Sequence, residues 1–247
     1  MLGRQHLMLS AATAAALAAP FIEHTGLALT FFTGACIGSL IPDVDAHDAA
    51  IFHRDLKGLN HGTGRMLNNF IGPALPFFGY TTKYLIYIPA VKFYNFLFSD
   101  YSFHGEHRSF SHSVLGIFTM TALTGVYIIS TLAVLQVFIP LYVGAFLLAY
   151  MTGAFLHMLQ DSCTKTGIAW NSPFSKTKLK GRLKTGKSRL KPRMFFTYLA
   201  TVAGITFYLG SIPSYTLSSV GLAVQTVLLL GASWLVFMHF SGVKRER

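Results

Sequence analysis

The chain has 247 residues, of which 52% are hydrophobic and 12% are charged, and its mean hydropathy is +0.49. Soluble proteins carry about 25% charged residues. So few charges cannot cover the surface of a soluble domain, and so many apolar residues exclude a disordered chain. The composition therefore predicts an all-α, polytopic helical membrane protein.

The net charge of +11 is concentrated in two short segments. Residues 176–193 hold nine of the 20 Lys and Arg and no acid, and residues 244–247 add three more. A basic run can bind nucleic acid, but beside apolar spans it typically marks a cytoplasmic loop. We therefore expect a cytoplasmic loop, and nucleic acid is the disfavoured partner.

Apolar stretches in chain order predict about six transmembrane helices, since a bilayer core needs ~20 helical residues. Their residue ranges are 7–22, 26–41, 114–135, 137–159, 194–212 and 217–240. The last four meet or approach the required length. The first two are shorter and predict an Ala-rich hairpin that turns at residues 23–26, in which Gly34 and Gly38 allow close helix contact.

The first stretch also has the features of a signal peptide. Arg4 precedes an apolar run that ends in Ala16-Leu17-Ala18, an A-x-A pattern. Because the apolar pattern resumes at once, we expect the segment to be retained as a helix. Cleavage is the alternative, and it would remove His6.

The stretch 70–98 differs from the other apolar segments. Prolines and lysines interrupt it, and Tyr and Phe are dense. This pattern predicts a re-entrant or interfacial helical insertion over residues 66–98 rather than a clean span.

The predicted organisation has three parts: a membrane-embedded core at 1–175, the basic loop at 176–193, and a transmembrane hairpin with a basic tail at 194–247. With the loop in the cytoplasm, the last two helices return the tail to the cytoplasm. Counting backwards, the helix ends that carry unusual polar residues reach the same face. We therefore expect the site and the C-terminus on the cytoplasmic side.

Two carboxylates close the second apolar stretch. Asp43 and Asp45 follow Pro42 where a helix meets the interface, and oxygen ligands at this spacing suit divalent cations. Turn chemistry after a proline is the alternative.

Two histidines precede the next span. His107 and His112 flank a short turn, so both rings could converge on one point, and Arg108 between them could pair with a phosphate or a carboxylate. An interfacial polar loop with a capping serine is the alternative.

A His–Asp pair ends the following span. His157 and Asp161 are four residues apart and lie on one helical face, so they could share an ion. Ionisable residues at the end of an apolar helix indicate function, although a structural pair is the alternative. His6, at the start of the first span, is by itself typical of an interfacial residue.

Convergence favours metal binding. Under the expected topology, seven residues emerge at one membrane face: His6, Asp43, Asp45, His107, His112, His157 and Asp161. They provide enough ligands for two divalent ions, with zinc favoured and manganese or iron as alternatives. Two such ions can activate water and stabilise the charge that develops during hydrolysis.

Three motifs occur in order: Gly38-Ser39-Leu40-Ile41-Pro42-Asp43-Val44-Asp45, then His107-Arg108-x-x-Ser111-His112-Ser113, then His157-x-x-x-Asp161-x-x-Thr164-x-x-Gly167 with Pro173-Phe174 downstream. Together they resemble the YdjM-like family of inner-membrane, metal-dependent hydrolases, some of which are described as LexA-binding. The resemblance covers roughly residues 1–175. This family is distantly similar to zinc-dependent phospholipase C and P1-type nucleases.

The resemblance implies metal ligation by the Asp pair, by the two histidines of the second motif and by the His–Asp pair, with His6 as the early histidine. The first two motifs lie further apart here than is usual in the family, which leaves the role of the insertion open. His53-Arg54 with His61 imitates the second motif. We treat it as a decoy because no apolar span begins there.

The sequence thus predicts a membrane-bound, metal-dependent hydrolase that acts at the cytoplasmic surface on a phosphoester of a lipid or lipid-linked substrate. Arg108 would bind anionic oxygens, Glu106 could act as a base or extra ligand, and Thr164 with Ser111 would orient the ligands. The basic loop would attract anionic membrane lipids. The alternatives are a regulatory membrane anchor that binds a protein or nucleic acid, and a divalent-metal transporter, which would hold its ligands at the membrane midplane.

Overall fold

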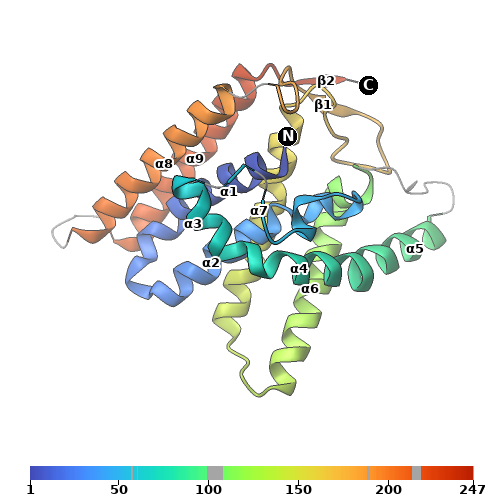
Figure 1. Cartoon of the computed structure of the whole chain (residues 1–247), viewed down its shortest axis with the longest axis horizontal. Coiled ribbons are helices and arrows are strands. Elements are labelled where there is room, and N and C mark those ends of the chain that lie inside the picture. Colours follow the sequence, from blue (N-terminus) through green and yellow to red (C-terminus); the bar gives the residue numbers. More distant parts are fainter. Residues whose placement is uncertain (57, 60, 99–107, 188–189, 213–217, 247) are drawn as a thin grey trace.

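The computed structural model describes residues 1–56, 58–59, 61–98, 108–187, 190–212 and 218–246 (Figure 1). The chain is helical with two short strands, which confirms the predicted all-α class. The helices are α1 (Gly3–Ala18), α2 (Thr25–Gly38), α3 (Gly62–Ile71), α4 (Leu75–Thr81), α5 (Ile88–Leu97), α6 (Val114–Val134), α7 (Pro140–Ser162), α8 (Leu190–Ser211) and α9 (Ser219–Phe240), and the strands are β1 (Lys178–Lys180) and β2 (Lys244–Glu246).

Among the described residues, five segments are long and apolar enough to cross a membrane: 3–38, 114–134, 140–162, 190–211 and 219–240. The first contains both α1 and α2, which a 3-10 turn at Ala19–His24 joins. At 16 and 14 residues, these two helices are about 24 and 21 Å long, less than the ~30 Å of a bilayer core. All six expected helices are therefore present as helices, but α1 and α2 together form one candidate span, so the described residues hold five candidate spans where the sequence predicts about six. The first two form the short, closely packed pair that the sequence predicts.

Small residues bring α2 into direct backbone contact with α7. A Cβ atom at Gly38 would lie 2.0 Å from the carbonyl oxygen of Tyr150, and one at Gly153 would lie 2.1 Å from that of Ala35. Only hydrogen fits at either position. The glycines of α2 thus allow close contact as expected, with α7 as the partner, and the C-terminal end of α2 is held against the middle of α7.

The C-terminal hairpin continues the same core. Phe195 and Leu199 of α8 and Trp234 of α9 are buried together with Leu9 and Ala12 of α1. In a bilayer, whose lipid tails are as apolar as these side chains, van der Waals packing holds such helices together. The helix that carries His6 is therefore enclosed by α2, α7 and α8.

The insertion forms a nearly continuous helical run across the molecule, as Figure 1 shows for α3, α4 and α5. A π-helical turn at Thr82–Tyr87 links α4 to α5. The run leaves large apolar side chains exposed, including Phe77 at 69% and Phe96 at 82%. It runs across the molecule without doubling back, and its place relative to the membrane stays a prediction.

The basic loop and the basic tail pair with each other. Strands β1 and β2 are antiparallel, with Lys178 opposite Glu246. The loop also folds over the C-terminal end of α7, where the backbone N–H of Lys165 donates to the carbonyl oxygen of Leu183 at 3.0 Å. Both basic segments therefore lie at the end of the molecule where α1 begins and α7 ends (Figure 1).

Candidate metal centre

Four separate elements bring the described site residues together. His6 lies in the second turn of α1, and His157 and Asp161 lie in the last turns of α7. Asp43 belongs to the 3-10 turn Ile41–Asp45, which follows α2, and His112 belongs to the 3-10 turn Phe110–His112, which precedes α6. Ser113 then caps α6 by accepting a hydrogen bond from the backbone N–H of Gly116 at 3.0 Å.

Four side-chain atoms form a compact cage. The Nε2 atom of His157 lies 3.5 Å from Asp43 Oδ1 and 3.8 Å from Asp161 Oδ2. The Nε2 atom of His112 lies 3.6 Å from Asp43 Oδ1 and 3.9 Å from Asp161 Oδ2. Two imidazoles and two carboxylates from three parts of the chain thus face a common point.

The cage has the dimensions of a tetrahedral zinc site. Ligands about 2.1 Å from a tetrahedral ion are about 3.4 Å apart, whereas neighbouring octahedral ligands at the same radius are about 3.0 Å apart. The four contacts of 3.5–3.9 Å lie a few tenths of an ångström above the tetrahedral value. Asp43, His112 and His157 are close enough together to hold one ion, and Asp161 lies at the edge of this group, 3.8 Å and 3.9 Å from its two histidines.

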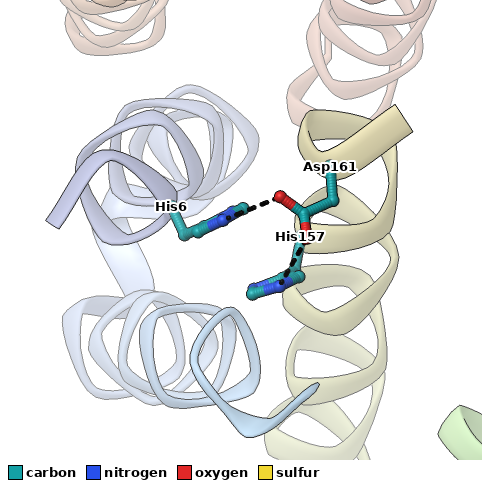
Figure 2. A group of neighbouring side chains, drawn as sticks. All are labelled: His6, His157 and Asp161. Carbon is teal, nitrogen blue, oxygen red and sulfur yellow. Dashed lines mark ion pairs between the residues drawn. The ribbon is translucent and has the colours of Figure 1, made fainter. Parts of the chain in front are cut away.

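His6 adds a second group of ligand atoms around Asp161 (Figure 2). Its Nε2 atom lies 3.3 Å from Asp161 Oδ1, the oxygen that also contacts the α-amino group of Met1. The His6 ring stacks on the His157 ring with centroids 3.7 Å apart and planes 9° apart. His6, His157 and Asp161 form one candidate metal group, and Asp43, His112 and His157 form another. Asp161 thus presents one oxygen to each side, as a carboxylate that bridges two ions would.

Each cage histidine has an orienting partner on its other ring nitrogen. His157 Nδ1 donates to the carbonyl oxygen of Ser39 at 2.7 Å. His112 Nδ1 lies 3.2 Å from Ser111 Oγ, whose own hydroxyl donates to Asp45 Oδ2 at 2.9 Å. In neutral imidazoles these contacts place the proton on Nδ1 and leave the Nε2 lone pair toward the cage, as metal-binding histidines require.

The family comparison covers nearly the whole chain. The model of the YdjM inner membrane protein family matches residues 1–242. The chain belongs to this family. The match extends beyond residue 175 into the C-terminal hairpin, so the predicted membership of the YdjM family is confirmed and reaches further than expected. The predicted hydrolase activity and the similarity to phospholipase C and P1-type nucleases stay predictions. No curated protein and no solved structure shows a significant match to the chain.

Asp45, the second acid of the YdjM Asp pair, lies behind the cage. Its Oδ2 atom accepts from Ser111 Oγ and from the backbone N–H of Arg108 at 2.8 Å, and it lies 3.6 Å from His112 Nδ1. The sequence predicts a ligand at this position. The geometry instead gives Asp45 the place of a carboxylate that orients a ligand histidine.

Arg108 is directed at a cage ligand. Its Nη2 atom lies 2.7 Å from Asp161 Oδ2, and its Nη1 atom contacts Thr166 Oγ1. The Arg108 backbone has φ 75°, a left-handed value rare for residues other than glycine. The hydrogen bond from its N–H to Asp45 holds that conformation, and the guanidinium reaches the edge of the cage.

Of the remaining predicted site residues, Thr164 lies beside the cage, and the other two cannot be placed. The hydroxyl of Thr164 donates to the backbone carbonyl oxygen of Asp161 at 2.7 Å, so Thr164 secures the end of α7. His107 and Glu106 lie outside the described residues. His53, the expected decoy, pairs instead with exposed Asp48 at 2.8 Å.

Sequence reasoning missed two participants. The carbonyl oxygen of Ser39 orients His157, and the hydroxyl of Thr166 contacts Arg108. Ser39 lies inside the first motif, but every residue has a backbone carbonyl oxygen, so the residue type does not indicate this contact. Thr166 follows the His–Asp motif, and nothing in that spacing predicts its contact with a residue 58 positions earlier.

The charges around the cage shift the pKa values of Asp43 and His112 in opposite directions, so that both groups are charged in the metal-free protein. Burial alone would raise the pKa of Asp43, but the nearby His157, His112 and His6 hold it well below its usual range. Burial alone would lower the pKa of His112, but Asp43 and Asp45 raise it to about 9. In the metal-free protein, a proton on His112 therefore supplies positive charge between the two acids.

Proposed function

We propose that this YdjM-family protein is a metal-dependent hydrolase that acts on a phosphoester of a lipid or lipid-linked substrate at the membrane surface. The observation that carries the proposal is the cage of His112, His157, Asp43 and Asp161. The Nε2 atom of His157 is buried and has no hydrogen-bond partner among the described residues, although it faces two carboxylates. Leaving such an atom unsatisfied costs about 1–3 kcal/mol, and a bound cation would remove that cost.

The donor set supports zinc, with manganese or iron as alternatives, because mixed imidazole and carboxylate ligands suit these ions. A divalent ion held there would supply Lewis acidity toward a phosphoryl oxygen and toward an attacking water. A second ion, if present, would be held by His6 Nε2 and Asp161 Oδ1, which lie 3.3 Å apart.

The protein's own side chains would bind and orient the substrate. Asp43 and Arg108 are the partly exposed members of the described centre, with side chains 17% and 18% exposed, whereas His112, His157 and Asp161 are fully buried. A substrate would therefore approach past Asp43 and Arg108. The guanidinium of Arg108 could exchange one contact with Asp161 for a contact with a phosphate oxygen.

The charge distribution supports a cytoplasmic location for the centre and the C-terminus. Both basic segments lie at the same end of the molecule as the cage, and such segments remain preferentially in the cytoplasm. They would attract anionic headgroups, and the exposed aromatic run α3–α5 would rest in the membrane interface. A lipid or lipid-linked phosphoester would thus be concentrated beside the site.

The position of the cage favours hydrolysis over transport. A transporter typically holds its ion near the midplane on broken helices. Here the ligands lie in the second turn of α1, the last turns of α7 and two short turns next to helix ends. A regulatory anchor remains the second candidate, and the basic β1–β2 ribbon would serve it, but that function leaves the buried cage without a role.

Turnover by purified protein tests the proposal. Zinc-, manganese- and iron-loaded protein in lipid nanodiscs is assayed on a panel of phosphomonoester and phosphodiester lipids, beside Asp161→Asn and Asp161→Ala variants. We expect metal-dependent release of a headgroup or phosphate, reduced at least about 100-fold in both variants. Bound metal without turnover on any member of the panel would contradict the enzymatic proposal while leaving the metal centre intact.

A further inference from the structure

A cavity of about 350 Å³ is lined by residues of α1, α8 and the start of α3, on the side of α1 away from the metal centre. His6 points into the cage, whereas Arg4, Gln5 and Met8 of the same helix line this cavity. The volume falls in the range of small-ligand sites, roughly 300–1,000 Å³. The cavity is therefore a separate space that the proposed hydrolysis does not use.

The polar lining of the cavity is basic. Arg4 comes from α1, Arg193 from the start of α8, and His61 from the residue that precedes α3. No carboxylate occurs among the described residues that line it. Guanidinium groups from two helices with no acid between them provide a site for an anion, and arginine suits phosphate through its planar set of donors.

The position of Arg4 depends on a glycine. A Cβ atom at Gly58 would lie 1.8 Å from Arg4 Nη1, so the guanidinium rests directly on the Gly58 backbone. Gly58 has φ 89°, a conformation that favours glycine. The loop before α3 thus leaves space for the arginine head at the edge of the cavity.

The cavity also has large apolar side chains in its lining, and the helices beside it expose further apolar side chains. Leu9, Leu59 and Phe196 are among the residues that line it. The helices α3 and α8, which form two of its walls, also expose Met66 at 74% and Met194 at 64%. A soluble anion would gain nothing from these apolar side chains, whereas a lipid would use both the charged and the apolar parts.

We infer that this cavity binds the phosphate headgroup of an anionic phospholipid, with Arg4 and Arg193 on the phosphate and the acyl chains against the exposed apolar side chains of α3 and α8. The basic segment 176–193 ends at Arg193, so it leads anionic lipids to this entrance. The inference concerns lipid binding alone and does not depend on hydrolysis at the metal centre.

Native mass spectrometry of the detergent-solubilised full chain tests the inference. Dioctanoyl phosphatidylglycerol is the probe, dioctanoyl phosphatidylcholine is the zwitterionic comparison, and inorganic phosphate is the soluble competitor. The test variant is Arg4→Gln/Arg193→Gln. The matched control is Arg65→Gln/Arg245→Gln, which removes two exposed arginines that do not line the cavity.

We expect wild type and the control to bind phosphatidylglycerol in preference to phosphatidylcholine, and the test variant to bind it at least about tenfold more weakly. Equal binding by the test variant and the control would overturn the site. Displacement of the lipid by an equal concentration of inorganic phosphate would overturn the lipid assignment and indicate a free-phosphate site. Metal content measured on the same samples keeps this result separate from the hydrolase proposal.

Discussion

His157 Nδ1 donates to the carbonyl oxygen of Ser39 at 2.7 Å, so the packing of α2 against α7 sets the direction of a ligand atom. Ser39 follows directly after Gly38, where the two helices are in backbone contact. The metal centre and the helix pair are therefore coupled through one hydrogen bond.

This coupling predicts that Gly153→Ala damages both stability and metal binding. The new Cβ would lie 2.1 Å from the carbonyl oxygen of Ala35 and 2.8 Å from the backbone nitrogen of Ser39. We expect the free energy of unfolding to fall by about 1–3 kcal/mol, together with weaker zinc binding. Thermal unfolding in detergent and zinc titration measure the two effects.

Gly231→Ala is the matched control, because position 231 lies in α9 with nothing within 4 Å of a new Cβ atom. It should leave stability unchanged or raise it by up to about 1 kcal/mol. Equal effects of the two substitutions would show that the contact between α2 and α7 is not the cause.

Asp45→Asn should weaken metal binding without abolishing it. Asp45 orients His112 through Ser111 rather than facing the ion, and loss of such a carboxylate typically costs about 10–100-fold in affinity. Asp43→Asn removes the negative charge of a carboxylate that faces the cage and should cost more. Zinc affinity measured against a competing chelator separates the two. Complete loss in Asp45→Asn, equal to that in Asp43→Asn, would make Asp45 a direct ligand.

Metal affinity should rise with pH between about 6.5 and 8.5, because a cation must displace the proton on His112, whose pKa is raised to about 9. In this window the metal-free protein carries that proton, so each pH unit favours the metal by up to about tenfold. Zinc titrations at three pH values measure the slope. A zinc affinity that is independent of pH would mean that the metal does not displace a proton from His112.

The pairing of β1 with β2 predicts that residue 186 and the C-terminus lie on one side of the membrane. Gly186 is at an open turn with φ 74°, so it should tolerate an epitope tag. We expect a tag there and a reporter after Arg247 to be cytoplasmic, and a tag at Gln136, between α6 and α7, to be external. An external reporter after Arg247 would invert the proposed topology.

The helices and most of the ligands follow from the sequence because hydropathy and scarce charges are local signals. Hydropathy marks α6 to α9 directly, and polar residues at helix ends identify Asp43, His157 and Asp161. The orientation of each histidine ring, by contrast, cannot be predicted from the local sequence. The place of Asp45 behind His112, and the ion pair from Arg108 to Asp161, depend on how distant segments pack.

The insertion likewise combines features that the sequence predicts with features that it leaves open. Its prolines and aromatic residues predict an interfacial or re-entrant region, and its sequence leaves that choice open. The path of the insertion depends on contacts with distant segments: the Tyr94 hydroxyl lies 3.0 Å from Thr119 Oγ1 of α6, and the helices α3 to α5 run across the molecule instead of folding back. Likewise, the pairing of the basic loop with the tail joins segments more than 60 residues apart.

The metal content of the purified protein tests the central claim most directly. Wild type, His157→Ala and Asp161→Asn are saturated with zinc, desalted and measured by elemental mass spectrometry, with His53→Ala as the control because His53 pairs with exposed Asp48 away from the cage. The account predicts one or two zinc ions per chain in wild type and in His53→Ala, and loss of zinc in both cage variants. Zinc retained at the wild-type level in His157→Ala and Asp161→Asn would contradict the metal centre.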